Sequence, residues 1–362
     1  VAHYLKRLGY RVALSGKQHI SPAEAFPFEY SGAKKNPDME TIDVMLAECK
    51  KAATPFCLFA CSNEPHTPWN KGDRSRYPVD KIKLAPYLVD TPETRDAMSR
   101  YLAEITYYDW QVGELLKLLD KHGLAENTMV MVVSEQGASL PFGKWTCYDT
   151  GLQSAMIVRW PGKVKAGVTS DAMVEYVDVL PTFVQAAGGK PAKVLDGKSF
   201  IPVLRGKTSK HKERVYGLMT TRGINNGSEF YGIRSVRDAR FKYIWNLTPE
   251  IEFQNACTKS KEFTSWIAAA EAGDKAAAER VRRYQNRPGE ELYEVSKDRY
   301  EWTNLADDPK YAEIKSELRA HLDDWMKRQG DKGQQTELEA TEHQNRARKS
   351  SSTGKKRKKK KK

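Results

Sequence analysis

The chain has 362 residues, of which 40% are hydrophobic and 30% are charged, and its formal net charge is +13. This composition belongs to a globular protein with a large core and excludes a disordered or fibrous chain. Eleven of the positive charges lie after residue 345, which leaves a net charge of about +2 for the remainder. No apolar run approaches the roughly 20 residues that cross a bilayer.

Helical and strand-like segments alternate in the first part of the chain. Residues 1–8 show the apolar spacing of a helix that stops at Gly9, and residues 10–14 follow as a strand. The pattern repeats with a helix over residues 38–51 and a strand over residues 55–61. Because this second strand is apolar throughout, it is predicted to be fully buried.

The longest predicted helix begins at Thr91-Pro92-Glu93, which combines a capping hydroxyl, an N1 proline and an early acid, and ends at Gly123. Apolar strands are predicted over residues 128–133 and 155–160. The alternation indicates an α/β fold with a mostly parallel central sheet flanked by helices. The side chains expected on the buried side of the long helix are Met98, Leu102, Ile105, Val112, Leu115, Leu116 and Leu119.

The pattern changes after about residue 206. Shorter strands separated by turn residues favour a small antiparallel sheet, and helical stretches follow. We therefore expect an α/β core over residues 1–205, a C-terminal subdomain with the antiparallel sheet and helices over residues 206–330, and a disordered Lys-rich tail over residues 331–362. The segments behind this division are strands at 215–219, 231–236 and 240–245, and helices at about 260–285 and 309–329.

The five cysteines have no metal-type spacing and are an odd number. They are interpreted as buried free thiols, at Cys49, Cys57, Cys61, Cys147 and Cys257.

Polar clusters follow three of the strand-like runs. They are Gly16-Lys17-Gln18-His19, the segment 63–68 that contains His66, and Ser134-Glu135-Gln136-Gly137, which is followed by Gly143-Lys144. Because ligands bind beyond the carboxyl ends of parallel strands, the clusters indicate one shared cationic pocket for an anionic substrate. Glu135 and Gln136 are the candidate oxygen ligands for a hard divalent metal.

Each cluster also has a purely structural interpretation. Lys17 and His19 alone suit a solvated loop as well as an anion site, and His66 could cap or pack. A Glu-Gln pair at a strand end is by itself a weak metal signal. These alternatives are open on the residues considered singly.

Taken in order, the motifs resemble those of the type I sulfatases of the alkaline phosphatase-like superfamily. Gly-Lys-x-His at 16–19, Pro-His-x-Pro at 65–68, and Ser-acid-amide-Gly at 134–137 with the following Gly143-Lys144 carry the resemblance, which extends to about residue 330. The segments 16–22 and 26–29 are similar to heparan N-sulfatase (sulfamidase)-like members.

The resemblance implies functions for these residues. Lys17, His19, His66 and Lys144 would hold the sulfate and protonate or stabilise groups around it, and Glu135 with Gln136 would bind calcium. The family's usual metal pair is Asp with Asn or His, so this pair is one methylene longer. The substrates implied are sulfated carbohydrates, and the location implied is periplasmic or secreted.

One family feature does not occur in this sequence, namely the Cys/Ser-x-Pro-x-Arg motif that becomes formylglycine. The expectation is a fragment, inactive as given, of a sulfatase that hydrolyses sulfate esters or sulfamates. Alternatives are an inactive sulfatase-like anion-binding protein, a phosphodiesterase or phosphonate hydrolase of the same superfamily, and a polyanion-binding role for the Lys-rich tail.

Overall fold

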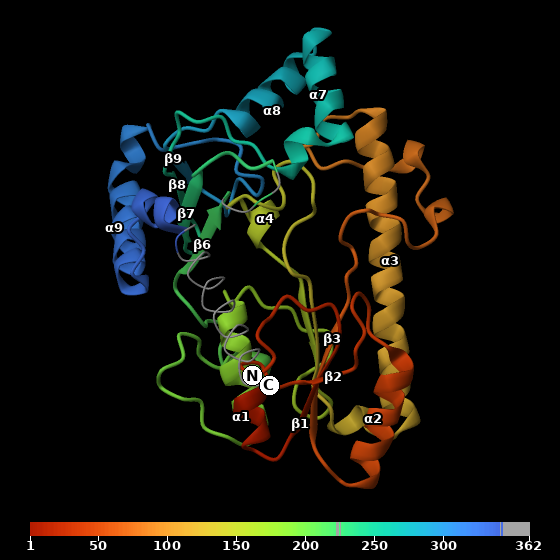
Figure 1. The fold of residues 1–362 in the computed structure, drawn as a ribbon. Helices are drawn as coiled ribbons and strands as arrows, with labels where there is room; N and C mark the ends of the chain where they lie inside the picture. The colour runs from red at the N-terminus through yellow and green to blue at the C-terminus, as the bar shows by residue number, and fades with distance from the viewer. Residues whose placement is uncertain (222–223, 225, 341, 343–362) are drawn as a thin grey trace, which may run out of the picture. The chain divides into compact units, whose positions relative to one another are not determined.

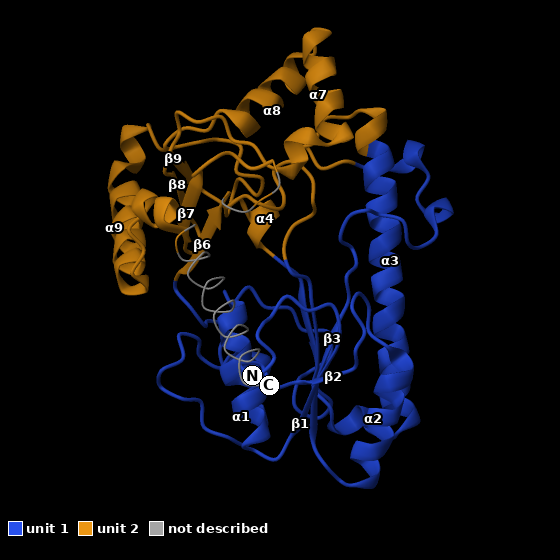
Figure 2. Ribbon diagram, viewed as in Figure 1, with its two compact units in different colours: residues 1–83, 95–135, 154–213 blue, residues 84–94, 136–153, 214–362 orange. Residues whose placement is uncertain are grey.

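The computed structural model describes residues 1–221, 224, 226–340 and 342. The chain forms two compact units, the first from residues 1–83, 95–135 and 154–213, and the second from residues 84–94, 136–153 and 214 onward (Figure 2). The sequence pattern did not predict that residues 84–94 and 136–153 belong with the second unit. Within the described residues, no helix is both long and apolar enough to cross a membrane.

The first unit has the predicted α/β architecture (Figure 1). A parallel sheet has the strand order β2-β1-β3, and β4 pairs with β5 in a separate antiparallel ladder. The elements of this part of the chain are α1 (Ala2–Lys6), β1 (Arg11–Gly16), β2 (Glu29–Tyr30), α2 (Met39–Lys51), β3 (Phe56–Cys61), α3 (Pro92–Lys121), β4 (Val130–Val133), β5 (Met156–Arg159), α5 (Val179–Ala186) and α6 (Ile201–Leu204).

Helices cover both faces of β1. Successive strand residues point to opposite faces, so Val12 packs with α1 and α5 while Ala13 packs with α2 and α3. The predicted helix over residues 38–51 is α2, and its N-cap Asp38 accepts hydrogen bonds from the backbone N–H groups of Glu40 and Thr41. The parallel sheet is therefore the middle layer of an α/β/α arrangement.

The strand β3 is less buried than the sequence predicts. Its six residues are all half-buried, whereas five of the six residues of β1 are buried. The difference follows from position, because β1 pairs on both sides and β3 lies at an edge of the described sheet. An apolar run indicates a strand, but it does not distinguish a central strand from an edge strand.

The buried side of α3 also differs from the prediction. Ile105 is 37% exposed, whereas Ala97, Glu104 and Gln111 are between 0% and 3% exposed. These three residues are spaced by seven positions and so share one face of the helix. The helix therefore buries a stripe that contains two polar side chains, which a search for apolar periodicity does not find.

The second unit contains the predicted antiparallel sheet, with strands in the order β6-β7-β8-β9. The predicted helical stretch over residues 260–285 is two helices, separated near Gly273, which has a φ of +100°. The elements are α4 (Asp149–Leu152), β6 (Val215–Thr220), β7 (Gly232–Arg237), β8 (Lys242–Asn246), α7 (Lys261–Glu271), α8 (Lys275–Gln285), β9 (Glu290–Tyr293) and α9 (Ala312–Gln329).

One face of this sheet packs against α9. Leu318, Leu322 and Met326 of the helix form a core cluster with Tyr243 of β8 and Leu292 of β9. All five side chains are at most 5% exposed. Burial of this apolar area holds α9 to the sheet.

The expectation that disorder begins at residue 331 is wrong for residues 331–340. Arg234 of β7 is 2% exposed, and its guanidinium pairs with Asp331 at 2.5 Å and with Glu337 at 2.8 Å. A buried guanidinium needs such partners, so these acids fix the segment. The run of lysines and arginine at 355–362 lies outside the described residues.

The cysteines are free thiols, as the sequence predicts. Cys49, Cys147 and Cys257 are buried, while Cys57 and Cys61 on β3 are half-buried. Burial raises the pKa of Cys57 and of Cys257 to about 12 and that of Cys147 to about 11.

We predict that Glu337→Ala destabilises the second unit, because it removes one of the two carboxylates that pair with buried Arg234. The expected loss is about 3 kcal/mol of unfolding free energy in urea titrations. Glu339→Ala is the matched control on the same segment, since the bond that Glu339 forms among the described residues is one accepted from the Gln335 side chain. An equal effect of the two substitutions would contradict the assigned role of Glu337.

Candidate functional site

The pairing of β1 with β3 brings the first two polar clusters to one edge of the sheet. Gly16, the last residue of β1, pairs with Cys61, the last residue of β3. The next backbone N–H, that of Lys17, donates to the Cys61 carbonyl oxygen at 2.9 Å. Gly16 has a φ of +102°, and a Cβ there would overlap the same carbonyl oxygen, so glycine is required.

Lys17 and His19 begin the loop that leaves this edge. Lys17 is half-buried and His19 is exposed. The loop after β3 contains His66, which is also exposed. The structure therefore places the Lys17 and His66 loops after two hydrogen-bonded parallel strands, as the sequence predicts.

The hydrogen bond of His66 determines its tautomer. Its Nδ1 lies 2.6 Å from the Thr67 carbonyl oxygen, which can only accept, so Nδ1 carries a proton. In the neutral ring Nε2 is then an acceptor. In this geometry His66 therefore donates from Nε2 only as an imidazolium, and accepts a proton there when neutral.

A buried polar network supports the loop after β3. The Ser62 hydroxyl lies 2.7 Å from Oε1 of Gln111 on α3 and 3.0 Å from Oδ1 of Asn36. The Asn36 side chain also donates to Oε1 of Glu64 at 3.1 Å and accepts from the backbone N–H of Asn63 at 3.1 Å. These bonds connect the loop to α3 and to the segment before α2.

The third cluster begins at the end of β4. Ser134 is bound to the start of β5 by two hydrogen bonds with the backbone of Ala155, at 2.8 and 3.1 Å. The Tyr176 hydroxyl donates to the Ser134 carbonyl oxygen. Burial raises the pKa of Tyr176, and the nearby charge of Glu135 adds to the rise. Glu135 itself is exposed.

Glu135 and Gln136 have the oxygen donors that calcium prefers, but they are too few. Calcium takes about six to eight oxygen ligands. The described residues contain no group of three or more His, Cys, Asp or Glu side chains placed to hold a metal. The described chain therefore does not form a complete calcium site by itself.

The segment that carries Lys144, in the second unit, folds back on itself. The Gly137 backbone N–H donates to the Gly151 carbonyl oxygen at 3.0 Å, and that of Lys144 donates to the Ala138 carbonyl oxygen at 2.8 Å. The Lys144 ammonium lies 5.1 Å from the centroid of the Trp145 ring, a cation–π distance.

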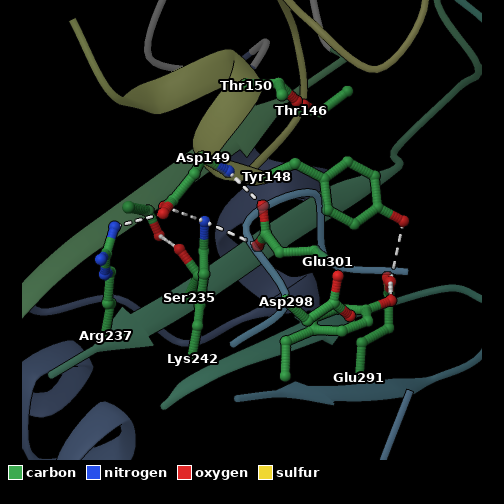
Figure 3. Close-up of polar contacts among 12 residues, drawn as sticks. Thr146, Tyr148, Asp149, Thr150, Ser235, Arg237, Lys242, Glu291, Asp298 and Glu301 are labelled. Atoms are coloured by element: carbon green, nitrogen blue, oxygen red, sulfur yellow. Dashed lines mark hydrogen bonds and ion pairs between the residues drawn. The ribbon is translucent and has the colours of Figure 1, made fainter. Parts of the chain in front are cut away.

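Buried charges hold the end of this segment (Figure 3). Lys242 of β8 is 1% exposed, and its Nζ lies 2.9 Å from Oδ1 of Asp149 and 3.0 Å from Oε1 of Glu301. Arg237 of β7 also pairs with Asp149. The backbone N–H of Asp149 donates to Oε2 of Glu301 at 2.5 Å. Two carboxylates thus surround one ammonium and fix the start of α4.

The two carboxyl groups of this network respond differently to their surroundings. Burial raises the pKa of Glu301 to about 7, because the attraction to Lys242 does not compensate for desolvation. Asp149 is also desolvated, but the charges of Lys242 and Arg237 outweigh this effect and lower its pKa.

A second contact set joins the same segment to β9. The Tyr148 hydroxyl donates to Oε2 of Glu291 at 2.8 Å, and the Tyr293 hydroxyl donates to the same oxygen at 2.6 Å. The Asn246 side chain donates to Oε1 of Glu291 at 2.7 Å. Glu291 is 1% exposed, so these donors satisfy a carboxylate removed from water.

The predicted site residues are divided between the two units. Lys17, His19, His66 and Glu135 lie in the first unit, and Gln136 and Lys144 lie in the second. Their functions remain predictions. The sequence analysis did not identify the buried polar residues that support the predicted site residues. A usable signal was present for Lys242, which is a charged residue within the otherwise apolar run at 241–245. The residues missed are Asn36, Glu64, Glu104, Gln111, Asp149, Lys242, Glu291 and Glu301.

Two family models match the chain. The model described as Sulfatase matches residues 1–189, slightly more than half of the chain. The model described as N-sulphoglucosamine sulphohydrolase, C-terminal, matches residues 137–272.

Curated relatives agree with these models. The chain is 34% identical over 341 residues to an ulvan-active sulfatase of Formosa agariphila, covering 91% of this chain and 65% of that protein. It is 24% identical over 367 residues to human N-sulphoglucosamine sulphohydrolase, covering 89% of this chain and 72% of that protein. The chain thus spans a little less than two thirds of the bacterial relative.

Solved structures show the same fold. A putative sulfatase from Bacteroides thetaiotaomicron superposes with a TM-score of 0.62 at 22% identity, covering 91% of this chain and 74% of the other. A protein solved in complex with its substrate, D-glucosamine-2-N,6-O-disulfate, superposes with a TM-score of 0.62 at 18% identity, covering 91% and 82%.

We predict that Lys242→Met strongly destabilises the second unit, because it leaves Asp149 and Glu301 buried without their shared ammonium. The expected loss is about 3–5 kcal/mol of unfolding free energy. Lys315→Met is the control, since Lys315 pairs with Glu290 in a partly exposed ion pair, a type worth about 0–1 kcal/mol. Urea titrations of both variants measure the difference, and comparable losses would argue against the buried network.

Proposed function

The chain belongs to the sulfatase family, and we propose that the protein hydrolyses sulfate esters or sulfamates of sulfated sugars. The observation that carries the proposal is the β1–β3 edge, where parallel pairing sets the loops of Lys17 and His66 after neighbouring strands. Cationic and imidazole groups at such an edge suit the negatively charged oxygens of a sulfate ester or sulfamate.

The side chains of this chain can bind the sulfate and move a proton. Lys17 would contribute a compact positive charge with three donors. His66 would accept a proton at Nε2 or return it, since Nδ1–H is held by Thr67. We include His19 and Lys144 among the sulfate ligands on the family resemblance. In sulfatases a formylglycine supplies the nucleophile. The four residues named above would instead bind the sulfate and transfer protons.

We propose a sulfated carbohydrate as the substrate. Support comes from the names of the relatives, which include an ulvan-active sulfatase and N-sulphoglucosamine sulphohydrolase. A structural neighbour was solved with a disulfated glucosamine. These relatives act on different sugars, so a panel with O-sulfated and N-sulfated members identifies the linkage.

A second candidate is an inactive sulfatase-like protein that binds sulfated sugars. The observation that favours it is that no cysteine or serine of this sequence lies in a Cys/Ser-x-Pro-x-Arg motif. Binding of a sulfated sugar without sulfate release by the complete gene product would support this candidate over the enzyme.

We further propose a periplasmic or secreted location, which rests on the family resemblance. Any nonspecific polyanion contact would involve the basic run at residues 355–362 and would weaken steeply with added salt.

We predict that Lys17→Ala lowers kcat/KM for sulfate release from a sulfated monosaccharide by at least a hundredfold in the complete gene product. The reason is the loss of a positive charge that stabilises charge on the sulfate oxygens. Lys34→Ala, at an exposed position of a neighbouring loop, is the control and should retain wild-type kinetics. Equal kinetics for the two variants would remove Lys17 from the site.

We predict that Glu135 and Gln136 supply two oxygen ligands of a calcium site that further ligands complete. Calcium should then raise the melting temperature of the complete gene product, and Glu135→Ala should remove the increase. Glu126→Ala, which removes another exposed acid, is the control and should preserve it. Calorimetry that detects no calcium binding to the wild-type protein would exclude the site.

A further inference from the structure

A pair of buried carboxyl groups lies behind the loop that carries His66. Glu104, on α3, is 0% exposed, and Glu64, two residues before His66, is 9% exposed. Among the described residues, neither carboxyl group forms an ion pair with a lysine or arginine. Buried carboxyl groups without a cation are unusual, because desolvation strongly disfavours their charged form.

One oxygen of Glu104 fastens the loop to α3. Its Oε1 accepts hydrogen bonds from the backbone N–H groups of Asn70 and Lys71, at 2.5 and 2.9 Å. The backbone of Gly72 approaches α3 so closely that a Cβ there would overlap the Ala103 carbonyl oxygen. The loop after His66 is thus held on the helix surface by its backbone.

The part of the same loop around His66 is held by a hydrogen bond between two of its own residues. The Trp69 indole N–H donates to the Pro65 carbonyl oxygen at 3.1 Å, which closes the turn around His66. The Trp69 ring packs against Tyr101 of α3 with centroids 5.4 Å apart. Displacement of residues 69–71 would therefore be transmitted to His66.

The second oxygen of Glu104 needs a proton. Oε2 is buried and accepts no hydrogen bond from an amide or hydroxyl group of the described residues. The carboxyl group of Glu64 is within hydrogen-bonding reach of Glu104. Two ionised carboxylates only accept and repel each other, so a bond between them requires one shared proton.

We propose that Glu64 and Glu104 share one proton, and that this carboxyl pair is a positioning device for His66 that fails when the proton is lost. The second half of the proposal rests on the proposed sulfatase function of His66. With the proton in place, Glu104 holds residues 70 and 71 and bonds to Glu64. Without it, the two charges repel across the base of the loop.

The surroundings of the pair agree with a proton as its partner. Burial and the neighbouring Glu64 raise the pKa of Glu104 to about 7, against the opposing effect of the two backbone N–H donors. The loop contributes Glu64, His66 and Lys71, of which Lys71 donates only its backbone N–H. From α3, Arg100 lies over the Trp69 ring at 6.0 Å. The segment before α2 contributes the neutral amide of Asn36.

The sign of the pH dependence follows from this pKa. Unfolded Glu104 loses its proton near the usual value of 4.5, whereas folded Glu104 keeps it to about 7. Folding therefore takes up a proton between these values, so the free energy of unfolding falls as the pH rises from about 4.5 to 7. Activity should decline over the alkaline end of this range as the loop loosens.

The test replaces the pair by a permanent hydrogen-bond donor. Glu104→Gln retains an oxygen for Asn70 and Lys71 and offers an amide N–H to Glu64 at every pH. In the complete gene product, we expect the ratio of kcat at pH 8 to kcat at pH 5.5 to rise about tenfold relative to wild type. Glu114→Gln, which changes a half-buried carboxylate that pairs with Lys117 on the same helix, should keep the wild-type ratio.

Two measurements do not require activity. The free energy of unfolding should fall more steeply between pH 5 and 7 for the wild-type protein than for Glu104→Gln. The difference between the two proteins is the quantity compared, because Glu301 titrates in the same range in both. The NMR signal of the His66 ring should shift with the ionisation of Glu104 in wild type and not in the variant. If both results are obtained but the protein releases no sulfate from any substrate, the proposed function is overturned and the proton-sharing pair remains supported.

Other outcomes overturn the inference. Identical slopes of the free energy of unfolding against pH for wild type and Glu104→Gln would show that the pair shares no proton. If Glu104→Gln does not fold, Glu64→Gln repeats the test. A divalent cation that stabilises wild type but not Glu104→Gln would show that the pair binds a metal. A changed stability slope with unchanged His66 signals and an unchanged kcat ratio would remove the positioning role.

Discussion

The parallel hydrogen bonding of β1 to β3 is the constraint on which the first half of the candidate site depends. Register pairs Gly16 with Cys61, so the two strands end together and release their loops at the same edge. The close approach at Gly16 allows no side chain, and helices on both faces hold β1 in the middle layer. The predicted site residues of this edge are therefore placed by backbone geometry, and exposed residues such as His19 need no packing of their own.

Each unit supports a segment that carries predicted site residues with charge removed from water, but the chemistry differs. In the second unit, Asp149 and Glu301 surround the ammonium of Lys242, and the charges of Lys242 and Arg237 outweigh the desolvation of Asp149. In the first unit, no lysine or arginine among the described residues pairs with Glu64 or Glu104, and in our proposal a shared proton neutralises the pair. Both arrangements cost free energy of folding unless every partner is present. The segments that they hold are therefore restricted to the conformation in which all partners are in contact.

The sequence indicated the fold class and the positions of the polar clusters because both follow from local patterns. Apolar runs and cap residues mark α2, α3 and the strands, and polar clusters follow the strand ends. Tertiary neighbours decided the rest. The apolar run of β3 does not reveal that this strand lies at an edge, and nothing near Asp331 shows that Arg234, about a hundred residues earlier, needs a carboxylate. Likewise Glu104 is polar in a helix, and only its contacts show that it is buried.

The rates at which the buried thiols are alkylated report local opening of the protein. Alkylating reagents attack the thiolate, and burial raises the pKa of the Cys49 and Cys257 thiols. Modification of either thiol therefore waits for a fluctuation that admits water and reagent. Because Cys49 lies in the first unit and Cys257 in the second, the two labelling rates report the opening of each unit separately.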